Sequence, residues 1–225
     1  RKLNVRNIKR ASAINGTVSL AMAISPAAAT VMDFNPTADG DVQTFGGDSV
    51  VTGNDLLTVT QSGGLARNGI LEFDLSSIPD TATINSAVLM FTLNRFISQV
   101  GSGLAAIDVI AYNGDGTVDI TDFAAAGTQV VDTTTPSAGT GGGDMLSFSF
   151  TSVVPIGDAL AANLLTVRIE TDSFAGIQIA SLENTSYDAP KLTIDYTEST
   201  IPVPGALAFG LTGLAGLAYM ARRKV

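Results

Sequence analysis

Oxygen-bearing side chains recur at short intervals in the segment Ala-Tyr-Asn-Gly-Asp-Gly-Thr-Val-Asp-Ile-Thr-Asp, residues 111–122. Ca²⁺ takes about six to eight oxygen ligands, and a glycine among them makes the sharp turn that folds a loop around the ion. Gly116 stands at such a place. The side chains that can supply oxygen are Asn113, Asp115, Thr117, Asp119 and Asp122. The segment therefore predicts a calcium site.

The spacing is similar to that of a dockerin or EF-hand loop, whose positions three, five, six, eight and twelve fall on Asn113, Asp115, Gly116, Val118 and Asp122. Two positions depart from the resemblance: Ala111 replaces the first Asp, and the twelfth residue is Asp instead of a bidentate Glu. The preceding residues indicate a strand rather than a helix. The alternative is a Gly-Asp-Gly turn with solvated acids, followed by an N-capped helical turn at Thr121.

A second candidate cation site consists of three acids near the ends of the folded region. Asp39 and Asp41 lie near the first expected strand, and Asp195 lies near the last. Because the end strands of a sandwich are often neighbours, the three carboxylates can meet. The alternative is that Asp39 and Asp41 are surface acids near a turn.

Paired carboxylates can also do chemistry, since glycoside hydrolysis uses two of them. Glu72 and Asp74 alternate outward on one expected strand, but no positioned partner is evident, and Glu170 and Glu183 are no better placed. The chain has no His, the commonest general base, and no Cys. We interpret Glu72 and Asp74 as surface acids and expect no enzymatic activity.

Sugar binding uses exposed aromatic faces with amides and charges beside them. The chain has no Trp, and most of its Phe fall at inward strand positions. The remaining candidates for a ligand-binding surface are Tyr112, Phe174, Asn184 and Tyr187. The alternative for Phe174 and Tyr187 is that they are loop residues packed on the core.

The charge distribution separates the middle of the chain from its ends. All 21 acidic residues lie between Asp33 and Glu198, but only four of the 12 basic residues do, so this region carries a net charge of −17. Such a surface repels nucleic acid and attracts divalent cations or basic partners. We therefore exclude nucleic-acid binding.

Alternation of apolar and polar residues dominates the middle of the chain, around residues 71–75, 87–93, 107–109, 146–150, 165–169 and 192–196. A period of two predicts half-buried strands. Short helices are expected at residues 121–126 and 156–164, and a flexible Gly- and Thr-rich loop at 133–144. We predict one all-β domain, an antiparallel β-sandwich (jelly-roll-like), over residues 30–197.

The N-terminal segment has the composition of a secretory signal peptide. A basic region, residues 1–10, precedes a weakly apolar stretch, residues 11–25, and small residues follow. Ala27 and Ala29 fit cleavage by signal peptidase after Ala29. The alternative is an amphipathic helix that stays attached.

The C-terminal segment, residues 198–225, indicates a linker and a membrane-spanning tail. Residues 201–221 carry no charge, and Arg222, Arg223 and Lys224 follow them. A bilayer core about 30 Å thick needs roughly 20 apolar helical residues, and cytoplasmic flanks favour Lys and Arg. We expect a C-terminal transmembrane sorting helix here.

The motif Pro202-Val203-Pro204, the small-residue-rich apolar stretch and the basic cluster together resemble the PEP-CTERM sorting signal, with Val203 in place of its Glu. The resemblance implies a Gram-negative bacterium, recognition by an exosortase-type protease, transient anchoring in the inner membrane, and release or attachment at the cell surface. It also implies association with exopolysaccharide matrices and biofilms. The alternative is a plain single-pass anchor.

Residues 67–79, RNGILEFDLSSIP, and 82–89, ATINSAVL, resemble the signature of the DNRLRE-type domain, a β-sandwich related to carbohydrate-binding modules. Residues 180–194 look like that family's final strand pair. The resemblance covers about residues 33–197 and implies polysaccharide binding, including anionic kinds. The acidic charge counts against an anionic ligand unless a cation bridges the two.

Together these features predict a secreted cell-surface or extracellular-matrix protein with a structural or adhesive role. The first alternative is a polysaccharide-binding module, and the second is a glycan-acting enzyme.

Overall fold

The computed structural model describes residues 28–199 except 45–46, 63–64, 99–104, 138–139, 172–173 and 175. The predicted sorting motif and basic cluster lie outside the described residues, as does the predicted signal peptide up to Ala27. Within the described ranges, no helix is long and apolar enough to cross a membrane.

Twelve strands make up most of the described residues. They are β1 (Ala29–Phe34), β2 (Ala38–Gln43), β3 (Ser49–Thr52), β4 (Leu56–Ser62), β5 (Leu65–Asp74), β6 (Thr83–Ser98), β7 (Ile107–Asn113), β8 (Thr128–Thr134), β9 (Met145–Ser149), β10 (Leu164–Glu170), β11 (Gly176–Ala180) and β12 (Lys191–Thr197). All their pairings are antiparallel. This confirms the prediction of an antiparallel all-β, sandwich-like fold.

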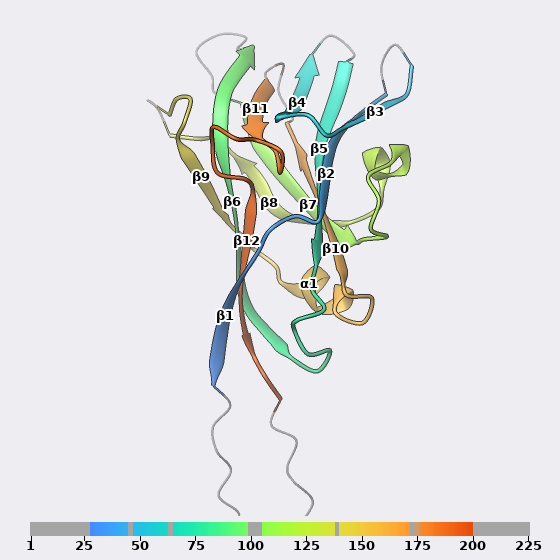
Figure 1. The fold of residues 1–225 in the computed structure, drawn as a ribbon, viewed down its shortest axis with the longest axis vertical. Coiled ribbons are helices and arrows are strands. Elements are labelled where there is room, and N and C mark those ends of the chain that lie inside the picture. Colours follow the sequence, from blue (N-terminus) through green and yellow to red (C-terminus); the bar gives the residue numbers. More distant parts are fainter. Residues whose placement is uncertain are drawn as a thin grey trace, which may run out of the picture. The chain divides into compact units, whose positions relative to one another are not determined.

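The strands form two layers joined through the 16-residue strand β6 (Figure 1). One layer has the order β1-β12-β6-β9, and the other contains β8-β7-β10-β5 with β2 and β3 beyond β5. The C-terminal part of β6 leaves the first layer and pairs with β11, which pairs with β4. Strands β9 and β8 are therefore the outer strands on one side of the two layers.

The core lies between the layers and follows the predicted alternation. Leu71 and Phe73 of β5 are fully buried, as are Leu89 and Leu93 of β6. Phe91 of β6 stacks on Phe148 of β9 with ring centroids 5.2 Å apart. A buried side chain of this size contributes about 1.5–3 kcal/mol to folding, so the core stabilises the fold without a disulfide.

Two short helices interrupt the strands: the 3₁₀ helix η1 (Ile120–Ala124) and α1 (Val154–Ala159). The helix α1 carries Pro155 in its first turn, where a missing N–H costs no hydrogen bond. It ends at Ala159 and β10 begins at Leu164, so the helix expected over residues 156–164 is shorter and begins earlier. Asn163, with φ of 60°, makes the turn between them.

The prediction of a flexible loop over residues 133–144 is partly wrong. The strand β8 extends to Thr134, and residues 140–144 form a turn held against β6. Gly143 N donates to Leu93 O at 2.7 Å, and Leu93 N donates to Asp144 O at 2.8 Å. Gly143 has φ of +92°, which glycine adopts without strain.

The two ends of the described unit lie side by side. The first and last strands, β1 and β12, pair so that Ala29 is opposite Thr197 and Phe34 is opposite Leu192. Both ends therefore leave the unit at the same end of the layers (Figure 1). The loop between β11 and β12 lies at the other end of β12.

Candidate functional site

The acids of the predicted calcium loop bond to their own neighbours. Asp115 Oδ1 accepts from Thr117 N at 2.9 Å and from Thr117 Oγ1 at 2.8 Å. Asp119 Oδ1 accepts from Thr121 N at 2.7 Å and from Thr121 Oγ1 at 2.6 Å. These are the local side-chain to backbone bonds that shape turns and begin helices.

Asp122 completes a capping box at the start of η1. Its Oδ2 accepts from Asp119 N at 2.9 Å, and the side chain of Asp119, the N-cap residue, accepts in turn from backbone N–H groups of the first turn. Its Oδ1 accepts from the hydroxyl of Tyr112 at 2.9 Å. The capped helical turn considered from the sequence is thus present. Among the residues that the structure describes, no group of three or more Asp, Glu, His or Cys side chains can hold a metal ion.

We expect chelation with EDTA to leave the melting temperature unchanged, because Asp115, Asp119 and Asp122 already have hydrogen-bond donors. Thermal unfolding with and without EDTA, and with added CaCl₂, measures this directly. An ion at 100 times its dissociation constant adds about 2.7 kcal/mol, so a bound calcium would appear as a fall of several degrees on chelation.

Glu72 of β5 is fully buried, so its interpretation as a surface acid is wrong. The residues between β7 and β8 cover this outer side of the layer. Thr166 Oγ1 of β10 donates to Glu72 Oε1 at 2.5 Å, and the backbone N–H of Gly116 also interacts with the Glu72 carboxyl. A side chain at Gly114 would collide with Glu72 Oε2, so glycine is needed there. Asp74 is exposed as expected, and its Oδ1 accepts from Ser76 N at 2.8 Å.

The surroundings of Glu72 favour its neutral form. Burial raises its pKa to about 7, against the lowering effect of the Thr166 hydrogen bond, and the nearby carboxylates of Asp122 and Asp115 raise it further. Burial also raises the pKa of Tyr112, with a further contribution from Asp122. Glu72 therefore acts as a protonated acid inside the fold at mildly acidic pH.

Arg168 of β10 holds the covering segment in place. It is 8 % exposed, and its Nη1 donates to the carbonyl oxygens of Asp122 at 2.9 Å and Ala125 at 2.8 Å. Its Nε pairs with Glu170 Oε1 at 2.5 Å, and its guanidinium lies 5.7 Å from the centre of the Tyr112 ring. One arginine thus ties η1 and the residues after it to the sheet. The sequence indicates only the side of the sheet on which Arg168 lies. Leu165, Val167 and Ile169 alternate as inward residues, so Arg168 falls on the outer face.

Asp39 and Asp41 of β2 are buried at the inner face, so their interpretation as surface acids is wrong. Asp39 pairs in register with the core residue Leu71, and Asp39 and Asp41 are 4 % and 2 % exposed. Asp39 Oδ2 accepts from Leu182 N at 2.6 Å. Burial raises the pKa of Asp39 to about 6, and the carboxylate of Glu183 contributes to the rise.

The proposed meeting of Asp39, Asp41 and Asp195 does not occur. Asp41 Oδ2 accepts from Thr58 N at 3.0 Å, and Arg67 Nη1 lies 3.6 Å from Asp41 Oδ1. Asp195 is on β12 of the other layer, where its Oδ1 accepts from Asn85 Nδ2 at 3.1 Å. The register places Asp195 beside β1 and β6, whereas β2 pairs with β5.

The four candidate ligand-binding residues lie on three separate parts of the fold. Tyr112, on β7, bonds to Asp122 beneath the covering segment. Phe174, between β10 and β11, is 64 % exposed. Asn184 and Tyr187 share the loop before β12, where Asn184 Oδ1 accepts from Tyr187 N at 2.7 Å. They do not form one surface.

Comparison with known proteins identifies no family for this chain. A scan against protein-family models finds no match, and a search of the curated proteins finds none.

Proposed function

We propose that residues 30–197 are the exported, folded part of a cell-surface or extracellular-matrix protein with a structural or adhesive role. A signal peptide ending at Ala29 directs export, and the Pro202-Val203-Pro204 tail is read by an exosortase-type membrane protease in a Gram-negative bacterium. The protein is held transiently in the inner membrane before the tail is removed. Its setting is an exopolysaccharide or biofilm matrix.

The observation that carries this proposal is the antiparallel pairing of β1 with β12, which from Thr30 opposite Tyr196 onward involves only residues that remain after cleavage at Ala29. The first strand begins at the predicted cleavage site, and the last strand ends five residues before the sorting motif. A unit whose two ends emerge together can be released from both segments without losing a strand. The net charge of −17 also suits a soluble body outside the cytoplasm.

We also propose that the unit is a jelly-roll-like sandwich of the DNRLRE type. The segment that carries the resemblance supplies β5, the turn after it and the first half of β6. Phe73, Leu75 and Ile78 from this segment are buried in the core. The signature thus coincides with the centre of the packing.

A polysaccharide-binding role is the second candidate, and the hollows beside β9 described below favour it. A glycan-acting enzyme based on Glu72 and Asp74 is less well supported. Glu72 is fully buried beneath Gly114 and accepts a hydrogen bond from Thr166, so a polymer substrate cannot reach its carboxyl group.

Surface labelling of intact cells tests the proposal. Lys191 is the only lysine between residues 30 and 200, and its side chain is 36 % exposed. A membrane-impermeant amine reagent should modify Lys191 in intact cells. Modification of Lys191 only after the cells are opened, with a cytosolic marker protein labelled in parallel, would contradict export.

A further inference from the structure

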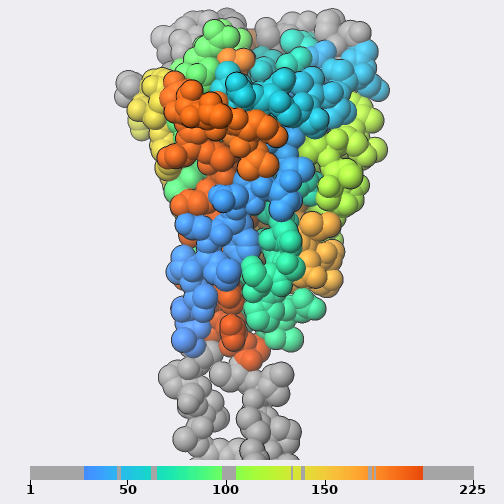
Figure 2. Space-filling model, in the orientation of Figure 1, coloured from blue at the N-terminus to red at the C-terminus, as the bar shows by residue number. Residues whose placement is uncertain are grey.

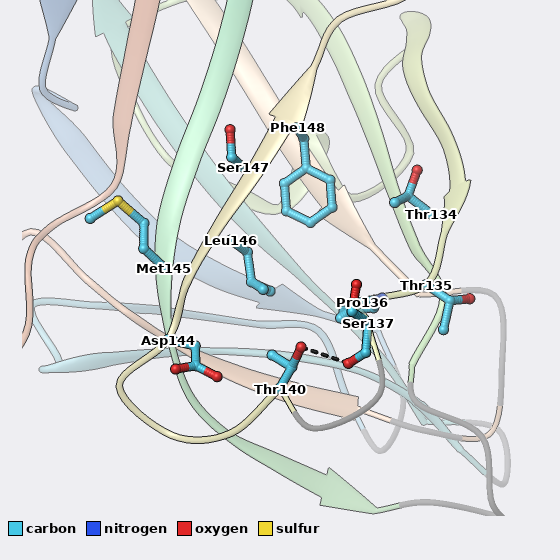
Figure 3. Close-up of a pocket in the computed structure, with 10 residues that line it drawn as sticks. All are labelled: Thr134, Thr135, Pro136, Ser137, Thr140, Asp144, Met145, Leu146, Ser147 and Phe148. Atoms are coloured by element: carbon cyan, nitrogen blue, oxygen red, sulfur yellow. Dashed lines mark hydrogen bonds between the residues drawn. The ribbon is translucent and has the colours of Figure 1, made fainter.

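A hollow of about 420 Å³ lies between the two outer strands β8 and β9 (Figure 3). Residues 134–137 and 140 line it from one side, and residues 144–148 line it from the other. In the described residues β9 pairs with β6 and β8 pairs with β7, so β8 and β9 do not pair with each other beside this hollow. The volume falls within the range of about 300–1,000 Å³ that is usual for small-molecule sites.

The lining of this hollow is rich in hydroxyl groups and poor in charge. Leu146, Phe148 and Pro136 provide apolar surface (Figure 3). Among the described residues that line it, only Asp144 is charged. The hydroxyl-bearing lining residues are Thr134, Thr135, Ser137, Thr140 and Ser147. Hydroxyl groups both donate and accept, so this lining suits a ligand with many hydroxyls and apolar C–H faces.

A second hollow of about 290 Å³ shares the lining residue Met145 with the first. Met145 lines both hollows and is 51 % exposed. The second hollow extends across β6 and β12 to the loop before β12, where Leu182 and Asp188 line it. Figure 2 shows the β9 region (yellow) and this loop (orange) side by side. We call the two hollows, which share Met145, the β9 groove.

One wall of the groove is the turn at residues 140–144. Asp144 Oδ2 accepts from Gly141 N at 2.7 Å, which orients the carboxylate. A side chain at Gly142 would collide with Asn94 O, so the turn lies tightly against β6. The wall is therefore formed before any ligand arrives, which lowers the entropic cost of binding.

The other wall is the loop before β12, which contains two of the residues that we considered for ligand binding. Asn184 Oδ1 accepts from Ser186 N at 2.8 Å and from Tyr187 N at 2.7 Å. Thr92 Oγ1 of β6 donates to Asp188 O at 3.1 Å. The side chain of Asn184 thus shapes this wall by accepting hydrogen bonds from two backbone N–H groups of the loop.

The charges around the groove argue against an anionic ligand. Arg67, Arg95 and Arg168 line neither hollow. Lys191 lines the second hollow, but its Nζ is paired with Asp33 Oδ2 at 2.9 Å. With net charge −17 on the whole unit, a polyanion would meet repulsion here.

We infer that the β9 groove binds one extended chain of a neutral polysaccharide, which crosses Met145 and contacts both hollows. The inference rests on the proposed matrix role for the presence of such a polymer. An extended chain can contact both hollows because they share one exposed apolar side chain, Met145. Hydrogen bonds to the Ser and Thr hydroxyls and to Asp144 orient the sugar rings.

Affinity electrophoresis of the full chain in a polyoxyethylene detergent tests this inference, with glucomannan, dextran and xylan as neutral probes and alginate as the acidic probe. We compare Ser147→Arg, which fills the groove, with Ser149→Arg, two residues further along β9 and outside both hollows. At least one neutral polymer should retard the protein. Ser147→Arg should weaken that binding about tenfold, and Ser149→Arg should change it less than about twofold.

Three outcomes would overturn the inference. They are no retardation by any neutral polymer, stronger retardation by alginate, and equal losses in the two variants. Labelling of Lys191 in intact cells does not depend on the groove. A labelled protein that binds no glycan therefore refutes the groove alone.

Discussion

The protein should be more stable at pH 5 than at pH 8, and Glu72 should account for much of the difference. Its pKa of about 7 in the folded state exceeds the ordinary value of 4.5. The folded state therefore binds more protons than the unfolded state in this range, so stability falls as the pH rises through about 7. The difference corresponds to roughly 3 kcal/mol from Glu72.

Asp39 acts in the same direction, because its pKa of about 6 is also raised from an ordinary 3.8. The pKa values of Asp33, Asp74 and Asp119 are lowered by hydrogen bonds, so their contribution is present above about pH 4 and is lost in stronger acid. Stability should therefore be highest at mildly acidic pH.

Glu72→Gln isolates the buried carboxyl, since the amide has nearly the same size and does not ionise. Urea unfolding at several pH values between 5 and 8 should show a variant that matches the natural protein at pH 5 and exceeds it at pH 8. Asp74→Asn, at an exposed position on the same strand, should keep the natural slope. An unchanged pH dependence in Glu72→Gln would show that Glu72 is ionised in the fold.

Arg168→Met should cost about 3 kcal/mol of unfolding free energy. The change removes a buried charge that binds two backbone oxygens and pairs with Glu170. Without it, Asp122 O and Ala125 O lose a donor, and the segment that covers Glu72 is released. Urea unfolding measures the cost, and hydrogen exchange should show faster exchange in residues 113–126 with little change in β6.

Arg95→Met is the matched control for this prediction. Arg95 is exposed, and its Nε donates to Gln178 Oε1 at 2.7 Å. An exposed bond of this kind contributes less than about 1 kcal/mol. Equal losses in the two variants would contradict the assignment of Arg168 as the residue that holds the covering segment.

The strands and core were predictable because alternation reports directly on burial. Leu71 and Phe73 show it on β5, and Leu89 and Phe91 show it on β6. The same pattern cannot reveal what lies over the outer face of a strand. Glu72 is polar at an outward position, as a surface acid would be, but the loop that contains Gly114, 42 residues later in the chain, covers it.

The candidate sites were less predictable because they depend on contacts distant in sequence. The acids at Asp115, Asp119 and Asp122 have spacing that suits either calcium or helix capping, and the capping hydrogen bonds of Asp119 and Asp122 could not be assigned from that spacing alone. The burial of Asp39 follows from its pairing with Leu71 and from Leu182 N, 143 residues away. The β9 groove combines segments that share no motif.

Export and sorting are best checked by mass spectrometry of the protein recovered from its cells, because one spectrum reports the positions of both chain ends. We expect a chain that begins at Thr30 and has lost the residues after the Pro202-Val203-Pro204 region. A soluble cytoplasmic form that still carries residues 1–29 and 205–225 would contradict export and sorting.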